Sequence, residues 1–206
     1  MNRQNPRNTV SDFYKNYGWS EKNKITEDSL LWEDLRDCSI DYISKCRLRL
    51  IPYIPIKGDN ILDMASGPIQ YKEYLDYSSN FKKRYCVDYS LEALNKAKLK
   101  IGDHGTFIPG DFFDVEFKNN FFDCSISLHT IYHIDKDKQE EAVRKLLKIT
   151  KREKPVIIIY SNPNTIISLL TSPFRNLGKF FKIKNIMKNK KNIYFYAYPI
   201  KWWERF

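Results

Sequence analysis

The sequence lacks three features, each of which would have set its class. None of its 206 residues belongs to an apolar run long enough to cross a bilayer, and the polar start Met1–Asn5 does not resemble a signal peptide. Its few cysteines include no CxxC pair, which argues against a zinc site or a disulfide framework. We therefore expect a cytoplasmic protein with reduced thiols and no bound metal. The cysteines are Cys38, Cys46, Cys86 and Cys124.

Acidic residues are nearly absent from the last quarter of the chain. The net charge is +10, and from Lys154 onward ten Lys and Arg residues accompany a single acid, Glu204. The preceding part of the chain is therefore almost neutral. A basic stretch mixed with apolar residues could contact anionic lipid, nucleic acid or a phosphorylated substrate, although a solvated surface is its more frequent use.

Aromatic residues, by contrast, make up 15% of the chain and favour a packed fold over disorder. The length suits one domain. Short apolar runs alternate with helical patterns, which is typical of a doubly wound α/β sheet. The predicted strands are 60–64, 84–88, 106–108, 121–128 and 155–160, and the predicted helices are 10–50, 71–75, 91–100 and 137–150.

Two of these apolar runs end in an acid. The first ends at Asp63 and enters the small-residue turn Ala65-Ser66-Gly67, and the second ends at Asp88. In a parallel sheet such strand ends form a nucleotide-type pocket, where the turn lets backbone approach the ligand and the second acid can accept hydrogen bonds from two ribose hydroxyls. A GxGxxG dinucleotide turn would need glycine at Ala65 and Gln70, so the NAD interpretation is weakened.

The order of four motifs over residues 57–162 resembles the class I methyltransferases that use S-adenosylmethionine (SAM), with a methyltransferase-11-type domain. Asp63–Gly67 matches their glycine-rich turn and Asp88 their ribose-binding acid. Gly110-Asp111-Phe112 matches the segment beside the adenine, and Phe122-Asp123 matches the pair that opens the fourth strand. The resemblance implies a Rossmann-like, mostly parallel sheet of order 3-2-1-4-5 and SAM as cofactor. The cofactor ligands that it implies are Asp63, Ala65, Ser66, Gly67, Asp88, Tyr89, Asp111, Phe112 and His129.

The turn departs from the family pattern at two positions. Ala65 replaces the usual glycine, which we expect to be tolerated if its backbone keeps a negative φ. Ile69 replaces another frequent glycine, so we expect a narrower turn. These departures leave reduced cofactor affinity open.

The segment His129–His133 corresponds to the part that faces cofactor and substrate in this family. A hydroxyl acceptor needs a base, and histidine titrates in the right range, so His129 and His133 are the catalytic candidates, with Tyr132 as an orienting hydroxyl. Packing at the strand exit is the alternative. The two histidines lack the acid of an HExxH pattern, so we expect no metal between them.

We predict a helical cap over 1–55, a SAM-binding core over 56–162 and a basic C-terminal extension of the same domain over 163–206. Tyr14 and Tyr17 of the cap either line the cofactor as a lid or pack between helices. Residues 161–164 are predicted to be a loop.

The family normally ends its sheet with a final pair of strands, and here the pair is incomplete or missing. Ile193–Tyr198 is expected to form a strand without a clear partner, and Lys201–Phe206 the start of a helix. We therefore hypothesise that the chain is truncated at its C-terminus.

The function implied is methyl transfer to an oxygen or nitrogen of a small molecule. The motifs are similar to those of bacterial methyltransferases that act on sugars, polysaccharide precursors or natural products. Nucleic acid is not favoured as a partner, but RNA methylation through the basic extension is one alternative, and a truncated domain without turnover is another. The oligomeric state stays open.

Overall fold

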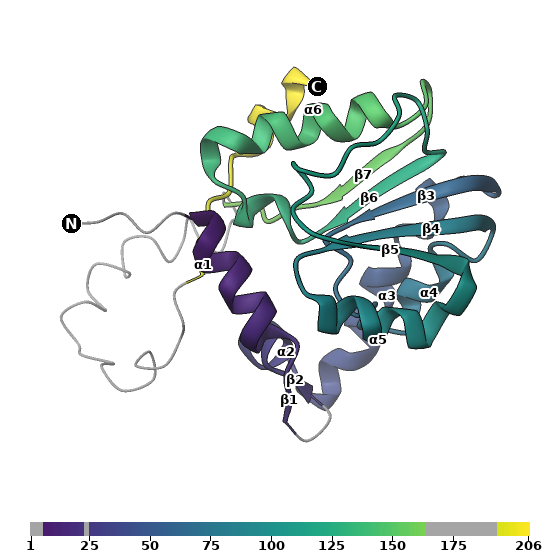
Figure 1. Ribbon diagram of the computed structural model, residues 1–206. Helices are drawn as coiled ribbons and strands as arrows, with labels where there is room; N and C mark the ends of the chain where they lie inside the picture. The colour runs from purple at the N-terminus through teal and green to yellow at the C-terminus, as the bar shows by residue number, and fades with distance from the viewer. Residues whose placement is uncertain (1–5, 23–24, 164–192) are drawn as a thin grey trace.

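The structure, a computed structural model, describes residues 6–22, 25–163 and 193–206. Its centre is a five-stranded parallel sheet of order β5-β4-β3-β6-β7 (Figure 1). Counted along the sheet's own strands this is the order 3-2-1-4-5, so the predicted fold class and topology are confirmed. The strands are β3 (Gly58–Met64), β4 (Phe81–Asp88), β5 (Gly105–Pro109), β6 (Cys124–Leu128) and β7 (Val156–Ile159).

Helices cover both faces of this sheet (Figure 1). Alternate residues of β3 point to opposite faces, as the pleat requires. Leu62 and Met64 belong to a buried cluster with Leu146 of one helix, while Ile61 packs with Leu50 and Tyr77 on the other side. The first face is covered by α6 (Gln139–Ile149) and the second by α3 (Ile40–Leu48), α4 (Glu73–Asp76) and α5 (Leu91–Ile101).

The N-terminal part forms a cap of short elements at one end of the sheet (Figure 1). One helical region was predicted over 10–50, and the structure instead divides it. Thr26 shows the reason, because its Oγ1 accepts a hydrogen bond from Ser29 N at 3.2 Å and starts a new helix. The elements are α1 (Pro6–Phe13), a π-helical turn over Tyr14–Gly18, the hairpin β1 (Glu21–Lys22) and β2 (Ile25–Thr26), and α2 (Glu27–Trp32).

The described C-terminal segment, residues 193–206, lies beside α6 (Figure 1). The strand predicted over Ile193–Tyr198 is wrong: this backbone is bound mainly by side chains and loops. Tyr196 N donates to Tyr132 O at 2.8 Å, and the buried Gln139 amide donates to Tyr196 O at 2.8 Å. A 3-10 helix, Ile200–Arg205, occupies the place of the predicted final helix. The basic run lies outside the described residues.

The connections are short 3-10 helices. No helix in the described part of the chain is both long and apolar enough to cross a membrane. The same residues contain no group of three His, Cys, Asp or Glu side chains that could hold a metal ion. The 3-10 connectors are Asp37–Ser39, Ile51–Tyr53, Gly102–His104, Ile131–His133 and Lys136–Lys138.

Candidate active site

Asp88, at the end of β4, holds the turn that follows β3. Gly67 N–H donates to Asp88 Oδ2 and Ser90 N–H to Asp88 Oδ1, both at 2.8 Å. Burial raises the pKa of Asp88 to about 6, although the two backbone donors oppose the shift. A carboxylate oxygen can accept more than one hydrogen bond, so both oxygens keep capacity for a ligand.

The turn itself has three residues in the left-handed region. The φ angles are 56° at Ala65, 54° at Gly67 and 50° at Ile69. The condition under which alanine was expected to be tolerated, a negative φ at Ala65, is therefore not met. Ser66 N–H donates a hydrogen bond to Val87 O at 3.2 Å, and this bond holds the chain against β4 immediately after Ala65. For an L-residue with a side chain this conformation costs about 1–2 kcal/mol.

A cavity of about 730 Å³ opens beside this turn, which is within the usual size range of small-molecule sites. Its walls come from the turn, the ends of β4 and β6, the cap, and Phe195 of the C-terminal segment. The predicted site residues that line it are Asp63, Ala65, Ser66, Asp88, Tyr89, His129 and His133, and Tyr14 and Tyr132 line it as well.

Gly67 has a second neighbour in Trp19 of the cap. A Cβ at Gly67 would lie 2.7 Å from the Trp19 indole, so the ring rests directly on the turn. Trp19 also lines the cavity, and its buried Nε1–H has no hydrogen-bond partner among the described residues. This donor is available to a ligand beside the turn.

Asp63 is held below the turn by a buried ion pair. Arg84 Nη2 and Nε donate to Asp63 Oδ2 at 2.5 and 3.1 Å, and both side chains are almost fully buried. Arg84 also donates to Tyr74 O at 2.5 Å. Asp63 thus fixes the end of β3 against β4, and its direct contact with a cofactor stays a prediction.

Three predicted cofactor residues do not line the cavity: Gly67, which lies against Trp19, and Asp111 and Phe112. Asp111 Oδ2 accepts a hydrogen bond from the Tyr89 hydroxyl at 2.7 Å, which links it to the wall through Tyr89. Phe112 belongs to the buried cluster under α6, and Lys145 Nζ lies 4.8 Å from its ring centroid. The roles of Asp111 and Phe112 beside an adenine ring stay predictions.

His133 is oriented by the C-terminal segment. Its Nδ1 lies 2.8 Å from Tyr194 O, and a carbonyl can only accept, so Nδ1 carries the proton and Nε2 the lone pair of the neutral ring. Burial lowers the pKa of His133 despite this hydrogen bond, which keeps the ring neutral near pH 7. Burial and the Arg47 charge likewise lower the pKa of His129.

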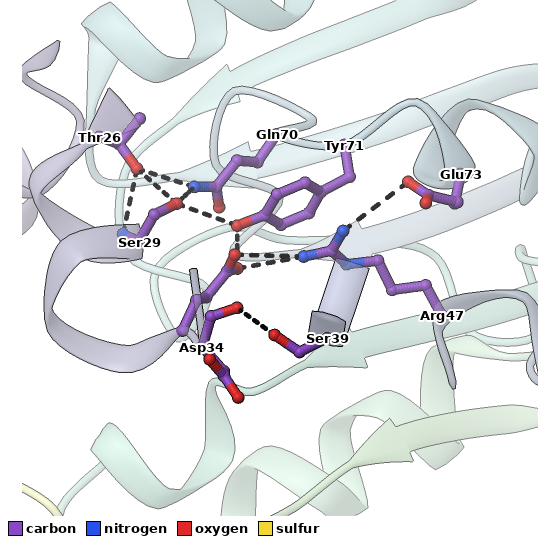
Figure 2. A network of polar contacts seen from close by, with 9 residues as sticks. Thr26, Ser29, Asp34, Ser39, Arg47, Gln70, Tyr71 and Glu73 are labelled. Atoms are coloured by element: carbon purple, nitrogen blue, oxygen red, sulfur yellow. Dashed lines mark hydrogen bonds and ion pairs between the residues drawn. The ribbon is translucent and has the colours of Figure 1, made fainter. Parts of the chain in front are cut away.

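A polar network joins the cap to the segment after the turn, as Figure 2 shows. Gln70 Nε2 donates to Thr26 Oγ1 at 2.7 Å and to Ser29 Oγ at 2.6 Å. Ser29 Oγ lies 3.0 Å from the Tyr71 hydroxyl. These contacts fix the cap over the cavity.

Arg47 of α3 extends the same network (Figure 2). Its guanidinium lies 3.2 Å from the centroid of the Tyr71 ring, and it pairs with Glu33 at 3.2 Å and Glu73 at 3.9 Å. The Tyr71 hydroxyl also donates to Glu33. Sequence reasoning missed these residues, and Thr26, an N-cap residue type, was the one signal for the helix that carries part of them.

The comparisons with known proteins agree with this geometry. Residues 62–158 match the family model described as a methyltransferase domain. No curated protein matches the chain in sequence. Together with the fold, the match shows that residues 62–158 form a methyltransferase domain similar to those of the class I SAM-dependent methyltransferases.

Three solved structures are similar in fold. A protein described as a methyltransferase, from Bacillus halodurans C-125, is 16% identical with a TM-score of 0.58, over 78% of this chain and 66% of that one. DhpI, solved with SAM and HEP, is 15% identical with a TM-score of 0.60, over 84% and 73%. Phosphoethanolamine N-methyltransferase 1 of Haemonchus contortus, solved with phosphoethanolamine and S-adenosylhomocysteine, is 11% identical with a TM-score of 0.59, over 74% and 32%. The chain thus spans just under two thirds of the Bacillus protein's length.

SAM is the cofactor of this family, and the residues at the turn fit it. Asp88 is fixed by two backbone donors and keeps acceptor capacity for the two ribose hydroxyls. Trp19 offers an unpaired indole N–H beside the turn. The cavity is also large enough to hold a nucleoside together with a small acceptor.

Proposed function

We propose that this protein transfers a methyl group from SAM to an oxygen or nitrogen atom of a small molecule. The observation that supports this most is the placement of Asp88 and His133 on one cavity. Asp88 supplies acceptors suited to a ribose, and His133 supplies a lone pair. A cavity of about 730 Å³ suits a small acceptor better than a nucleic-acid strand.

When bound, SAM supplies an electrophilic methyl group. The protein's own contribution is then positioning and proton removal. The cavity walls hold the acceptor, and the cap excludes water from it. His133 Nε2 takes the proton from the acceptor, while Tyr194 O holds the ring in the correct tautomer. The choice of an oxygen or nitrogen atom as the methyl acceptor is part of the proposal.

Binding of S-adenosylhomocysteine (SAH) by calorimetry tests the cofactor side. We expect saturable binding to the wild type, and about a 100-fold loss in Asp88→Ala, because that variant removes two charge-assisted hydrogen bonds. Asp76→Ala, at an exposed position, serves as the matched control and should bind as the wild type does. Absence of heat with the wild type would leave the truncated, non-catalytic interpretation.

Methyl transfer itself is tested with labelled SAM and a panel of amines, sugars and RNA. Transfer to a small molecule is expected. Transfer to RNA alone, with strong salt dependence, would contradict the proposal and support the basic extension as an RNA-binding element.

A cytoplasmic location is also part of the proposal. All four cysteines are unpaired, and burial raises the pKa of Cys86 and of Cys124 to about 12, so both thiols stay protonated. Unpaired thiols are typical of a reducing compartment. The division into a cap, a core and a C-terminal extension is proposed in the same way.

A further inference from the structure

The cavity described above is lined by more acid than base, and the inference drawn from this rests on the proposed function. Most of its carboxylates have a positively charged partner. Asp63 is paired with Arg84 at 2.5 Å, and Glu33 with Arg47 at 3.2 Å. Asp34 pairs at 2.5 Å with Arg36, and Arg36 does not line the cavity. The carboxylates on the wall are Asp28, Glu33, Asp34, Asp63 and Asp88, and Arg47 is the one Lys or Arg among the described residues that line it.

These pairs leave two of the wall carboxylates without a positive partner: Asp88, which accepts from two backbone N–H groups, and Asp28. The Tyr14 hydroxyl donates to Asp28 Oδ1 at 3.0 Å, and no described Lys or Arg side chain forms an ion pair with it. Burial raises the pKa of Asp28 to about 6, so the group is still ionised at neutral pH. A partly buried carboxylate in this state is stabilised by a cation from outside the protein.

Aromatic rings gather around His133 in this cavity, and one of them, Tyr14, also donates its hydroxyl to Asp28. The ring centroids of Tyr14, Trp32 and Phe195 lie 6.3, 6.4 and 6.0 Å from that of His133, and all four side chains line the cavity. Aromatic faces attract cations, and ammonium ions in particular.

We propose that the methyl acceptor is an amine, which enters the cavity as an ammonium ion and is held by Asp28 and the rings of Tyr14, Trp32 and Phe195. An acceptor that carries phosphate or carboxylate on this side would meet an unpaired negative charge. Arg47 does not offset that charge, because it already contacts Glu33 and Glu73.

The reaction balances with the groups present. The ammonium N–H proton passes to His133 Nε2, which frees the nitrogen lone pair. The nitrogen then forms its bond to the methyl carbon while the carbon–sulfur bond of the donor breaks, and that electron pair remains on sulfur. The product is again an ammonium ion, and His133 returns its proton to solvent.

Binding measurements on the full chain saturated with SAH test this without turnover. The probes are primary amines of increasing size, from methylamine upward, each compared with the corresponding alcohol. We expect at least one amine to bind, about tenfold or more tightly than its alcohol, and Asp28→Asn to remove that preference. The matched control Asp41→Asn, at an exposed position of α3, should retain it.

The outcomes separate this inference from the proposed function. If SAH binds but no amine does, or if alcohols bind as well as amines, the amine inference is overturned while the cofactor site stands. If Asp28→Asn weakens SAH itself more than about twofold, Asp28 serves the cofactor and the inference fails. Absence of SAH binding in the wild type would overturn both.

Discussion

The two sides of the cavity are built differently. On the cofactor side, backbone N–H groups beside the ends of β3 and β4, two strands that α4 connects, fix Asp88, and the contacts join residues at most 21 positions apart. On the acceptor side, side chains converge from the cap, from the exit of β6 and from the C-terminal segment. The first side is therefore set by the fold of the family, while the second is free to differ between members.

The largest effect should come from the interior beneath the cofactor side. Arg84→Met removes one partner of a fully buried ion pair and should lower the free energy of unfolding by about 3–5 kcal/mol. Urea denaturation measures this. The double variant Arg84→Met/Asp63→Leu should recover most of the loss, and failure to recover would show that Asp63 has a separate structural role.

The next effect concerns the acceptor side. His133→Gln keeps a donor for Tyr194 O but removes the basic nitrogen, so we expect about a 100-fold loss in the rate of methyl transfer with SAH affinity unchanged. His104→Gln, which lies away from the cavity, is the matched control. Equal loss of SAH affinity in His133→Gln would mean that the two sides are not separable.

The pH dependence should distinguish the two sides further. Asp88 has a pKa of about 6, raised by burial, so its accepting form is lost as the pH falls through 6. SAH affinity should then fall by up to about tenfold for each pH unit below that value. Calorimetry between pH 5 and 8 measures it, and Asp88→Asn should show a flat profile. A flat profile in the wild type would contradict the assignment of Asp88.

The linked effect on stability has the opposite sign. An acid whose pKa is raised on folding binds more protons in the folded state between its ordinary value near 4 and about 6. Asp88 and Asp28 should both make the protein less stable as the pH rises through this window. Urea midpoints at pH 5 and pH 7 check this, and Asp28→Asn should reduce the difference.

The smallest effect lies in the turn. Ala65→Gly should raise the free energy of unfolding by about 0.5–1 kcal/mol, because glycine adopts the positive φ of 56° without strain. Ala93→Gly in α5 is the matched control, and there the same change should destabilise by about 1 kcal/mol. Destabilisation by Ala65→Gly would show that the alanine methyl contributes packing that outweighs the strain.

The comparison also explains which features the sequence could predict. The strand ends at Asp63 and Asp88 are local patterns, so they could be predicted from the sequence, whereas the sheet order came from the resemblance to a known family. Ser90 is likewise a local signal: it is the N-cap of α5, and its Oγ accepts a hydrogen bond from Ala93 N at 3.2 Å. The left-handed backbone of Ala65 could not be predicted in this way, because it is imposed by the hydrogen bond of Ser66 with β4, which no local propensity reports.

The acceptor side could not be predicted in this way. Phe195 and Asp28 are far apart in sequence, and only the packing of the cap and the C-terminal segment brings them to one cavity. The strand predicted over 193–198 failed for the same reason. Its backbone is bound by side chains such as Gln139 and Tyr160, whose partners no periodicity reveals.

A crystal structure of the full chain with SAH tests the central claim most directly. The account predicts that the ligand lies between the Ala65–Gly67 turn and Asp88, with both ribose hydroxyls within hydrogen-bond distance of the Asp88 carboxylate. A ligand elsewhere, or a ribose held by other groups while Asp88 keeps only its bonds to Gly67 and Ser90, would contradict it.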